Sequence, residues 1–213
     1  MQAIENKRKL YIAKRKAVRL FDGNLLEWAS TCHHIVPFII FIPTILFFSG
    51  LSIYYVLEGY IDKPLYIIPL SIGAILLWTI IEYTGHRYVF HYNATSTFGK
   101  RMLYVIHWAH HDYPDDTKRL VVPPLVTVPA GILLYYLSYL AFGYYAAPFF
   151  TVLVCSYLIY DWCHFACHHL NFKNPYFQKI KKHHLRHHYK DPDHDYGFTT
   201  TLWDDVLKTR LKI

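Results

Sequence analysis

Charged residues are scarce in this sequence. Asp, Glu, Lys and Arg make up 17% of the 213 residues, whereas hydrophobic residues reach 54%. Soluble domains usually carry about a quarter charged residues, so this deficit favours a membrane protein with compact polar parts. The formal net charge of +7 comes without a basic helix interleaved with aromatic residues and without zinc-finger spacing. We therefore expect no nucleic-acid partner.

Cysteine is also scarce, with only four in the chain. They are too few, and too close to apolar runs, for a disulfide framework, so we expect the polar parts in a reducing compartment. The first thirty residues contain no apolar segment typical of a signal peptide. The length corresponds to one domain.

Three long runs contain no charged residue at all. They are Ile35–Leu57 with 23 residues, Pro64–Ile81 with 18 and Leu120–Tyr160 with 41. About 20 helical residues cross a bilayer core, so the third run holds two spans, with a break near Gly143 to Pro148, or a pair of re-entrant helices. We predict an all-α integral membrane fold with four transmembrane helices in two hairpins, at about 35–57, 64–82, 122–142 and 146–162.

The remaining segments are polar. Residues 83–119 and 163–213 are expected to form a helical cap, which completes a single membrane-embedded domain over 35–213. Residues 1–34 are basic and form either an amphipathic helix on an anionic membrane surface or a solvated tail. Of the 22 Lys and Arg residues, only Lys63 falls on the side opposite to the cap. The positive-inside rule then predicts a multi-pass protein with its site on the cytoplasmic face, in the endoplasmic reticulum of a eukaryote or the inner membrane of a bacterium.

Histidine is abundant on that polar side. The chain has 15 histidines, and ten of them fall into four motifs: His86-x4-His91, His107-x2-His110-His111, His164-x3-His168 and His184-x2-His187-His188. Spacings of three and four place side chains on one helix face, so the last motif is expected to point all three rings at one spot. The spacing of five in the first motif needs a helix end or a π-turn.

Ten imidazoles exceed what one metal ion uses, so we predict two ions. Imidazole suits Zn, Cu, Fe and Ni. The Glu of a His-Glu-x-x-His protease motif and the Glu-x-x-His of soluble di-iron bundles are both missing. An all-histidine pair beside a bilayer favours O2-activating iron acting on a lipid. A metal transporter is the competing hypothesis, but it needs ionisable residues along a pathway within the membrane, and no span interior here contains His, Asp or Glu.

Several neighbours have two interpretations. Glu82, Asp112 and Asp161 either orient ligand rings through hydrogen bonds or are ordinary interfacial charges. Cys163 and Cys167 are offset from the histidines beside them and are expected to pack. The roles of three further histidines stay open: His169, which could support the ligands, His183 and His194.

The ordered motifs of residues 78–208 resemble the fatty acid 2-hydroxylase family, within the fatty acid hydroxylase and sterol desaturase superfamily. The motifs that carry this resemblance are Glu82-Tyr-x-x-His86-Arg-x-x-Phe90-His91, Ile106-His107-x-x-His110-His111, Arg119-Leu-Val-x-Pro123-Pro124, Tyr160-Asp-x-x-His164-x-x-x-His168-His169, Lys182-His-His184-Leu-x-His187-His188 and Gly197-Phe-x-Thr-x-x-Leu-Trp203-Asp204.

The resemblance implies O2-dependent hydroxylation at C2 of a long acyl chain, as a free acid or in a sphingolipid. It also implies that the ten motif histidines hold two metal ions, with iron as the working metal, although zinc can occupy such sites. Thirty N-terminal residues cannot supply the cytochrome b5 domain of many members, so we expect a separate donor, cytochrome b5-like or ferredoxin-like, with its reductase. His183 replaces an expected aromatic residue. A related sterol, carotenoid or alkyl-lipid oxidase or desaturase is the alternative.

Overall fold

The computed structural model describes residues 18–212, and these form helices, turns and loops without a strand. The predicted all-α class is confirmed for this range. The chain divides into two compact units. We call residues 35–82 and 124–162 the membrane unit, and residues 18–34, 83–123 and 163–212 the polar unit. Residues 1–17 of the predicted N-terminal amphipathic segment lie outside the described residues.

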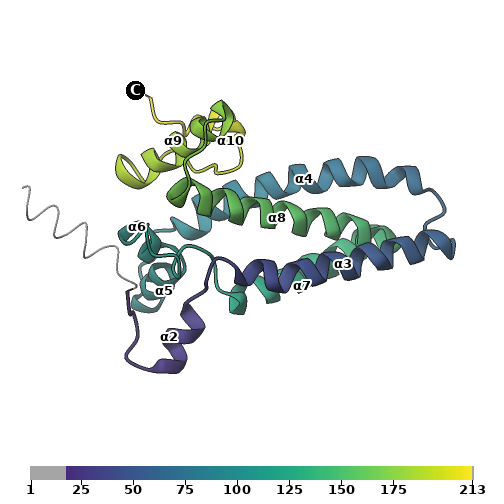
Figure 1. Ribbon diagram of the computed structural model, residues 1–213, viewed down its shortest axis with the longest axis horizontal. Coiled ribbons are helices and arrows are strands. Elements are labelled where there is room, and N and C mark those ends of the chain that lie inside the picture. The colour runs from purple at the N-terminus through teal and green to yellow at the C-terminus, as the bar shows by residue number, and fades with distance from the viewer. Residues whose placement is uncertain (1–17, 213) are drawn as a thin grey trace, which may run out of the picture. The chain divides into compact units, whose positions relative to one another are not determined.

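Four helices build the membrane unit: α3 (Val36–Leu57), α4 (Ile67–Thr84), α7 (Pro124–Phe142) and the first part of α8 (Ala146–His169) (Figure 1). Within residues 18–212, three helical stretches are long and apolar enough to cross a membrane: Val36–Leu57, Pro64–Phe90 and Pro124–His169. The third has 46 residues and contains both α7 and α8. A 3-10 turn over Gly143–Tyr145 separates these two helices, at the position where the charge-free run is expected to break.

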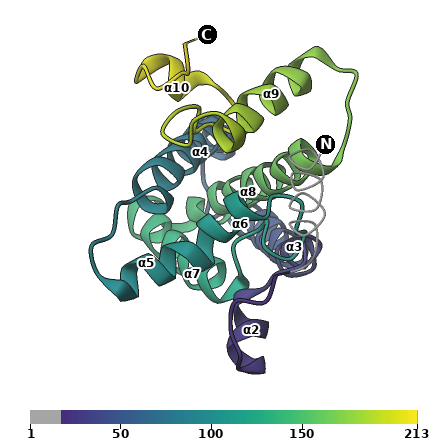
Figure 2. The same cartoon turned by 90° about the vertical axis from the view of Figure 1, so that its left-hand side faces the viewer.

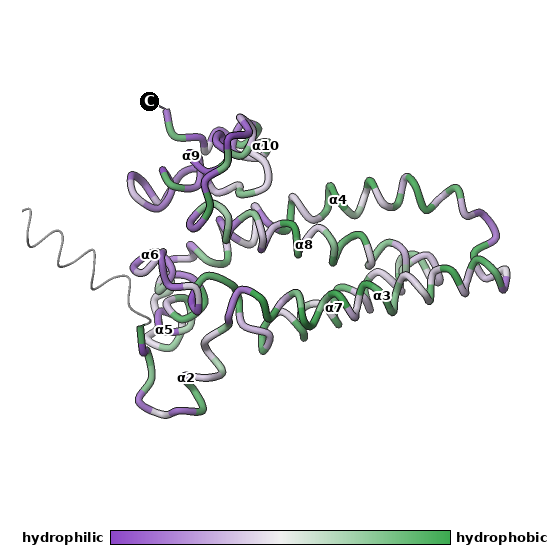
Figure 3. The backbone as a smooth tube through the Cα atoms, in the orientation of Figure 1, coloured by the Kyte–Doolittle hydropathy of each residue, from purple (hydrophilic) through white to green (hydrophobic). Residues whose placement is uncertain are grey.

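Aromatic side chains fill the interior of the membrane unit. Phe48 of α3 contacts Tyr135 of α7 and Phe150 of α8, with ring centroids 4.6 and 5.0 Å apart. Trp78 of α4 contacts Tyr157 of α8 at 5.5 Å. Many large apolar side chains of the same helices are exposed, and Figure 3 shows these helices as predominantly hydrophobic. Lipid is the solvent that such a surface fits.

The two loops at one end of the membrane unit are joined to each other. The Tyr145 hydroxyl accepts a hydrogen bond from the Lys63 backbone N–H at 3.0 Å and donates to Asp62 at 3.1 Å. Tyr55, Tyr60 and Tyr144 pack together beside them. Tyrosine is enriched at membrane interfaces, because its ring is apolar and its hydroxyl is polar.

The polar unit is made of short helices: α2 (Asn24–Ser30), α5 (Thr97–Leu103), α6 (Ala109–Asp112), α9 (Pro175–Tyr189) and α10 (Leu202–Val206) (Figure 2). The end of α8 belongs to this unit. Two π-helical segments, Gly85–Phe90 and Tyr104–Trp108, precede histidines of the first two motifs or contain them. Of the two arrangements predicted for the spacing of His86 and His91, a helix end or a π-turn, the structure has a π-helical segment that stops at Phe90.

Arg119 fastens the N-terminal described segment to the polar unit. Its guanidinium is almost fully buried and donates hydrogen bonds to the carbonyls of Ser30 at 2.8 Å and Val18 at 3.0 Å. It also pairs with the Glu27 carboxylate. Arginine presents several donors in a rigid fork, so one side chain holds both ends of residues 18–30.

Candidate metal centre

The ten motif histidines lie in the polar unit and form two groups of five. In each group, one ring nitrogen from every residue lies within 4.8 Å of the others. Group one contains His86, His91, His107, His111 and His187. Group two contains His110, His164, His168, His184 and His188. All ten predicted residues are therefore brought together, and they divide into two clusters, the number that ten imidazoles suggested.

The division cuts through two of the motifs. His184 and His188 belong to group two, whereas His187 belongs to group one. The expectation that these three rings point at one spot is therefore wrong. Each residue turns an α-helix by about 100°, so positions four apart differ by about 40° while adjacent positions point in different directions. His107 and His111 share group one for the same reason, and His110 lies in group two.

Group one is tightly spaced around its Nε2 atoms. His107 Nε2 lies 3.1 Å from that of His86, 3.0 Å from that of His91 and 2.9 Å from that of His111. His187 Nε2 lies 3.1 Å from His91 Nε2 and 3.2 Å from His111 Nε2. Five nitrogens from three segments of the chain thus face one small volume.

Group two has similar spacing and adjoins group one. His164 Nε2 lies 2.9 Å from His110 Nε2, and His168 Nε2 lies 2.7 Å from His184 Nε2. The rings of His111 and His188, one from each group, are stacked with centroids 4.2 Å apart. The two clusters are therefore neighbours rather than separate sites.

Backbone carbonyls set the tautomer of two histidines in group one. His86 Nδ1 donates to the carbonyl of Tyr196 at 2.6 Å, and His187 Nδ1 donates to the carbonyl of His194 at 2.7 Å. A carbonyl oxygen only accepts, so the proton of each neutral ring is on Nδ1. The lone pair of each ring is then on Nε2 and points into group one.

Burial keeps these rings neutral. It lowers the pKa of His91 to about 3 and that of His111 to about 2, and repulsion from His187 adds to both shifts. Burial also lowers the pKa of His187 to about 4. The pKa values of four others fall well below the ordinary histidine value for the same reason: His107, His110, His184 and His188. Neutral imidazole is the form that binds metal.

This donor set fits a metal ion in each group. At least the Nε2 atoms of His86 and His187 carry lone pairs, so hydrogen bonds among the rings cannot satisfy all five converging nitrogens of group one, and a cation is the partner that would stabilise them together. Two imidazole nitrogens on perpendicular bonds of about 2.1 Å to one ion would be about 3 Å apart. The observed spacing of 2.9–3.2 Å in group one agrees with that value.

Comparison with known proteins identifies the family. Residues 71–209 match the family model described as fatty acid hydroxylase. The chain belongs to the fatty acid hydroxylase family. The resemblance carried by the histidine motifs is thereby confirmed. Members of this family are oxidoreductases, as the resemblance implies.

Relatives of this family member include a dihydroceramide fatty acyl 2-hydroxylase of Arabidopsis thaliana, 32% identical over 93% of this chain and 82% of the relative. A ceramide very long chain fatty acid hydroxylase of Saccharomyces cerevisiae is 32% identical over 89% of this chain and 48% of its own length. The human fatty acid 2-hydroxylase is 30% identical over 91% of this chain and 57% of its own length. The chain thus spans about half the length of the yeast and human relatives.

A solved structure has the same fold. It is that of full-length Scs7p, in which only the hydroxylase domain is visible. The TM-score is 0.82 at 30% identity, over 92% of this chain and 74% of the solved one. The helical arrangement of this family member is therefore that of a known hydroxylase domain.

Four residues were predicted either to orient the ligand rings or to have no role in the site: Glu82, Asp112, Asp161 and His169. Asp112 accepts a hydrogen bond from the Tyr104 hydroxyl at 3.0 Å. His169 stacks on Phe165, with centroids 4.8 Å apart, and is in neither group. Glu82 and Asp161 are buried residues of the membrane unit. A role for these four in orienting ligands stays a prediction.

Sequence reasoning missed Phe198 and the two carbonyl groups. Phe198 is fully buried, and its ring centroid lies 4.5 Å from that of His86, 4.7 Å from that of His164 and 4.6 Å from that of His184. One side chain therefore packs against both groups. The Gly197-Phe198 signature of the family was the available signal. Backbone carbonyls carry no signal of their own in a sequence.

Proposed function

We propose that this protein hydroxylates a long-chain fatty acyl group at C2, as a free acid or in a sphingolipid, at a metal pair held by the ten histidines. One atom of O2 enters the C–H bond and the other leaves as water, with two electrons from an external donor and two protons. The observation that carries this proposal is the convergence of ten neutral imidazoles in two adjoining groups, in a member of this family.

The metal chemistry limits which ion can work. A redox-active pair, with iron expected, would supply the reduction of O2, whereas zinc has no redox chemistry. Group one residues would hold one ion and group two residues the other. Phe198, which stacks on His164 and meets the His184 ring edge-on, would exclude water from both. His86 and His187 would keep their lone pairs toward the ion, because the carbonyls hold their Nδ1 protons.

Lipid analysis tests the activity. Cells with a suitable donor should accumulate 2-hydroxy acyl chains when they express the wild-type protein, and not when they express His187→Ala. Lys179→Ala is the matched control, because this residue lies on the same helix, is exposed and is in neither group. A product hydroxylated elsewhere would favour a related lipid oxidase. Unchanged lipids together with metal-dependent flux into vesicles would favour a transporter.

We also propose four transmembrane spans with the polar unit on the cytoplasmic side. The break at Gly143–Tyr145 and its hydrogen bonds to the 58–63 loop support two hairpins whose loops share one side. The near absence of Lys and Arg from those loops supports the orientation. In a variant whose four native cysteines are replaced, Glu58→Cys and Lys173→Cys should react with a membrane-impermeant thiol reagent from opposite sides. Labelling from one side only contradicts the topology.

A separate electron donor is proposed to dock on α9. A groove of ≈ 600 Å³ beside this helix is lined by apolar residues, including Phe172, Phe177 and Leu185, and by Lys182 and Lys190. Both lysines are exposed, so they suit an acidic carrier. Lys182→Glu with Lys190→Glu should slow reduction by cytochrome b5 and weaken the salt dependence of its rate. Lys63→Glu is the control, and equal rates in all three proteins contradict this docking site.

A further inference from the structure

The loop 194–197 carries both carbonyls that orient group one. His194 supplies the acceptor for His187, and Tyr196 supplies the acceptor for His86. A displacement of this loop would release two of the five rings in group one. The contacts that hold the loop therefore decide how well that group is ordered.

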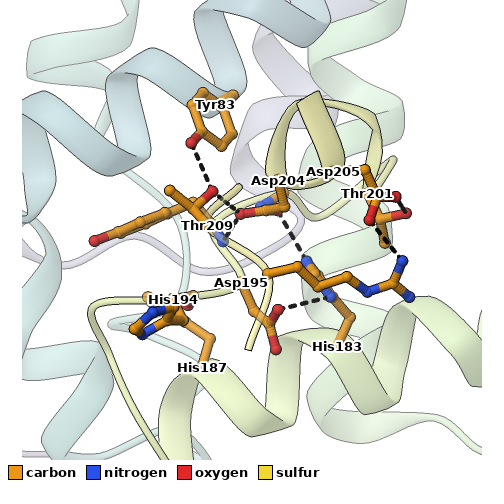
Figure 4. A network of polar contacts seen from close by, with 12 residues as sticks. Tyr83, His183, His187, His194, Asp195, Thr201, Asp204, Asp205 and Thr209 are labelled. Carbon is orange, nitrogen blue, oxygen red and sulfur yellow. Dashed lines mark hydrogen bonds and ion pairs between the residues drawn. The ribbon is translucent and has the colours of Figure 1, made fainter. Parts of the chain in front are cut away.

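Asp204 of α10 holds the loop from one side (Figure 4). Its carboxylate is fully buried and accepts the backbone N–H of Tyr196 at 3.0 Å and of Gly197 at 2.8 Å. It also accepts the Thr209 hydroxyl at 2.7 Å and lies 2.9 Å from His183 Nε2. One side chain thus ties α9, α10 and the loop together.

Asp195 holds the loop from within. Its φ of 60° is uncommon for a residue other than glycine, and its backbone N–H donates to the Thr209 carbonyl at 3.0 Å. Its buried carboxylate accepts Arg186 Nε at 2.8 Å and the Leu211 N–H at 3.0 Å. It also lies 3.2 Å from His183 Nδ1.

His183 is therefore placed between two buried carboxylates. Its ring is 1% exposed and is in neither group of converging nitrogens. Arg186 Nη2 also lies 3.3 Å from Nδ1, so both ring nitrogens face charged groups. The unexpected histidine of the last motif has a polar environment that a phenylalanine side chain could not satisfy.

Fewer hydrogen bonds hold the Nδ1 atoms of the rings in group two than in group one. Among the described residues, the Nδ1 atoms of His110, His184 and His188 are buried and have no hydrogen-bond partner. In group one this is true only of His91. Hydrogen bonds to the second nitrogen fix the ring and raise its basicity, and their loss typically costs 10–100-fold in metal affinity.

We propose that His183, Asp195 and Asp204 form a clamp that positions the loop 194–197 and thereby makes group one the tighter of two metal sites. This inference rests on the proposed metal centre and assigns unequal metal affinities to its two groups. Within the clamp, His183 is a positioning residue. A purely structural role would change stability and leave the ratio of the two affinities unchanged.

Metal competition on the purified full chain tests the clamp. Co²⁺ is titrated against a chromophoric chelator, and its absorption bands are recorded for wild type, Asp204→Asn and Asp205→Asn. Asp205 is the matched control, since it neighbours Asp204 but bonds to Thr201 and Arg210 near the surface. We expect two unequal affinities in wild type. Asp204→Asn should lower the tighter one by roughly 10–100-fold, and Asp205→Asn should leave both unchanged.

Two further variants assign the sites, and a third covers a folding failure. His86→Ala should abolish binding of the more tightly bound Co²⁺ ion together with its absorption bands. His168→Ala should abolish binding of the more weakly bound ion. If Asp204→Asn does not fold, His183→Phe replaces it and should act in the same direction. An equal loss of affinity for both ions, or no loss of affinity for either, overturns the clamp. A chain that binds no metal ion contradicts the proposed function itself.

Discussion

The rings of His187 and His188 stand at 88° to each other, with centroids 5.7 Å apart, although the two residues are adjacent in the chain. Each belongs to a different group. Alanine at either position should therefore reduce bound metal from two ions to about one, with different ions lost. Elemental analysis and the Co²⁺ spectrum of each variant measure this. Identical spectra for the two variants would contradict the division.

Phe198 should contribute strongly to stability, because it is fully buried against rings of both groups. Phe198→Ala should lower the free energy of unfolding by about 3–5 kcal/mol, the usual cost of such a cavity. Phe98→Ala is the control, since Phe98 is 77% exposed. Chemical denaturation in detergent measures both, and a similar small loss in each would refute the packing role.

Gly197 has no room for a side chain. A Cβ there would lie 2.1 Å from the Thr200 carbonyl oxygen and 3.1 Å from the Asp204 carboxylate. Gly197→Ala should cost about 1–3 kcal/mol, as overpacking does, and should also disturb group one through the loop. Gly73→Ala, with nothing within 4 Å of its Cβ, is the comparison. Equal melting temperatures for the two variants would exclude the clash.

Arg119→Ala should release the N-terminal segment. Its hydrogen bonds to Ser30 and Val18 and its pairing with Glu27 are lost together, at roughly 1.5–3 kcal/mol for a charged donor. Hydrogen exchange over 24–30 should accelerate, while exchange over 175–189 stays as in wild type. The exposed Lys100→Ala variant should change neither region. Uniform acceleration across both regions would indicate global destabilisation instead.

The metal-free protein should lose stability as the pH falls below about 7. Burial depresses the pKa of His91 to about 3 and of His187 to about 4 in the folded state. Below pH 6.5 the unfolded chain therefore binds protons that the folded chain does not. Each such histidine removes up to about 1.4 kcal/mol per pH unit between its two pKa values. Thermal unfolding at pH 7.5 and 5.5 measures the loss.

The control for this pH dependence is a variant with one buried histidine fewer. His91→Ala should shift its melting temperature less between the two pH values than wild type does. If the melting temperature falls equally in both proteins between pH 7.5 and 5.5, protonation of His91 does not drive the loss of stability.

The sequence alone determined much of the centre. The i+5 spacing of His86 and His91 predicted a helix end or a π-turn, and a π-helical segment is present there. The four motifs contained all ten histidines that converge. Charge-free runs predicted the apolar helices, because an interior without water excludes charge over a length set by the bilayer. These properties are local or compositional, so a one-dimensional pattern contains them.

Only the tertiary structure decided how the histidines divide. Which of His184, His187 and His188 faces which group depends on how α9 packs against α6 and the end of α8, and spacing alone cannot specify that. The role of His183 was hidden for the same reason. Its partners Asp195 and Asp204 lie 12 and 21 positions further along the chain, and they reach it only because the loop folds back onto α9.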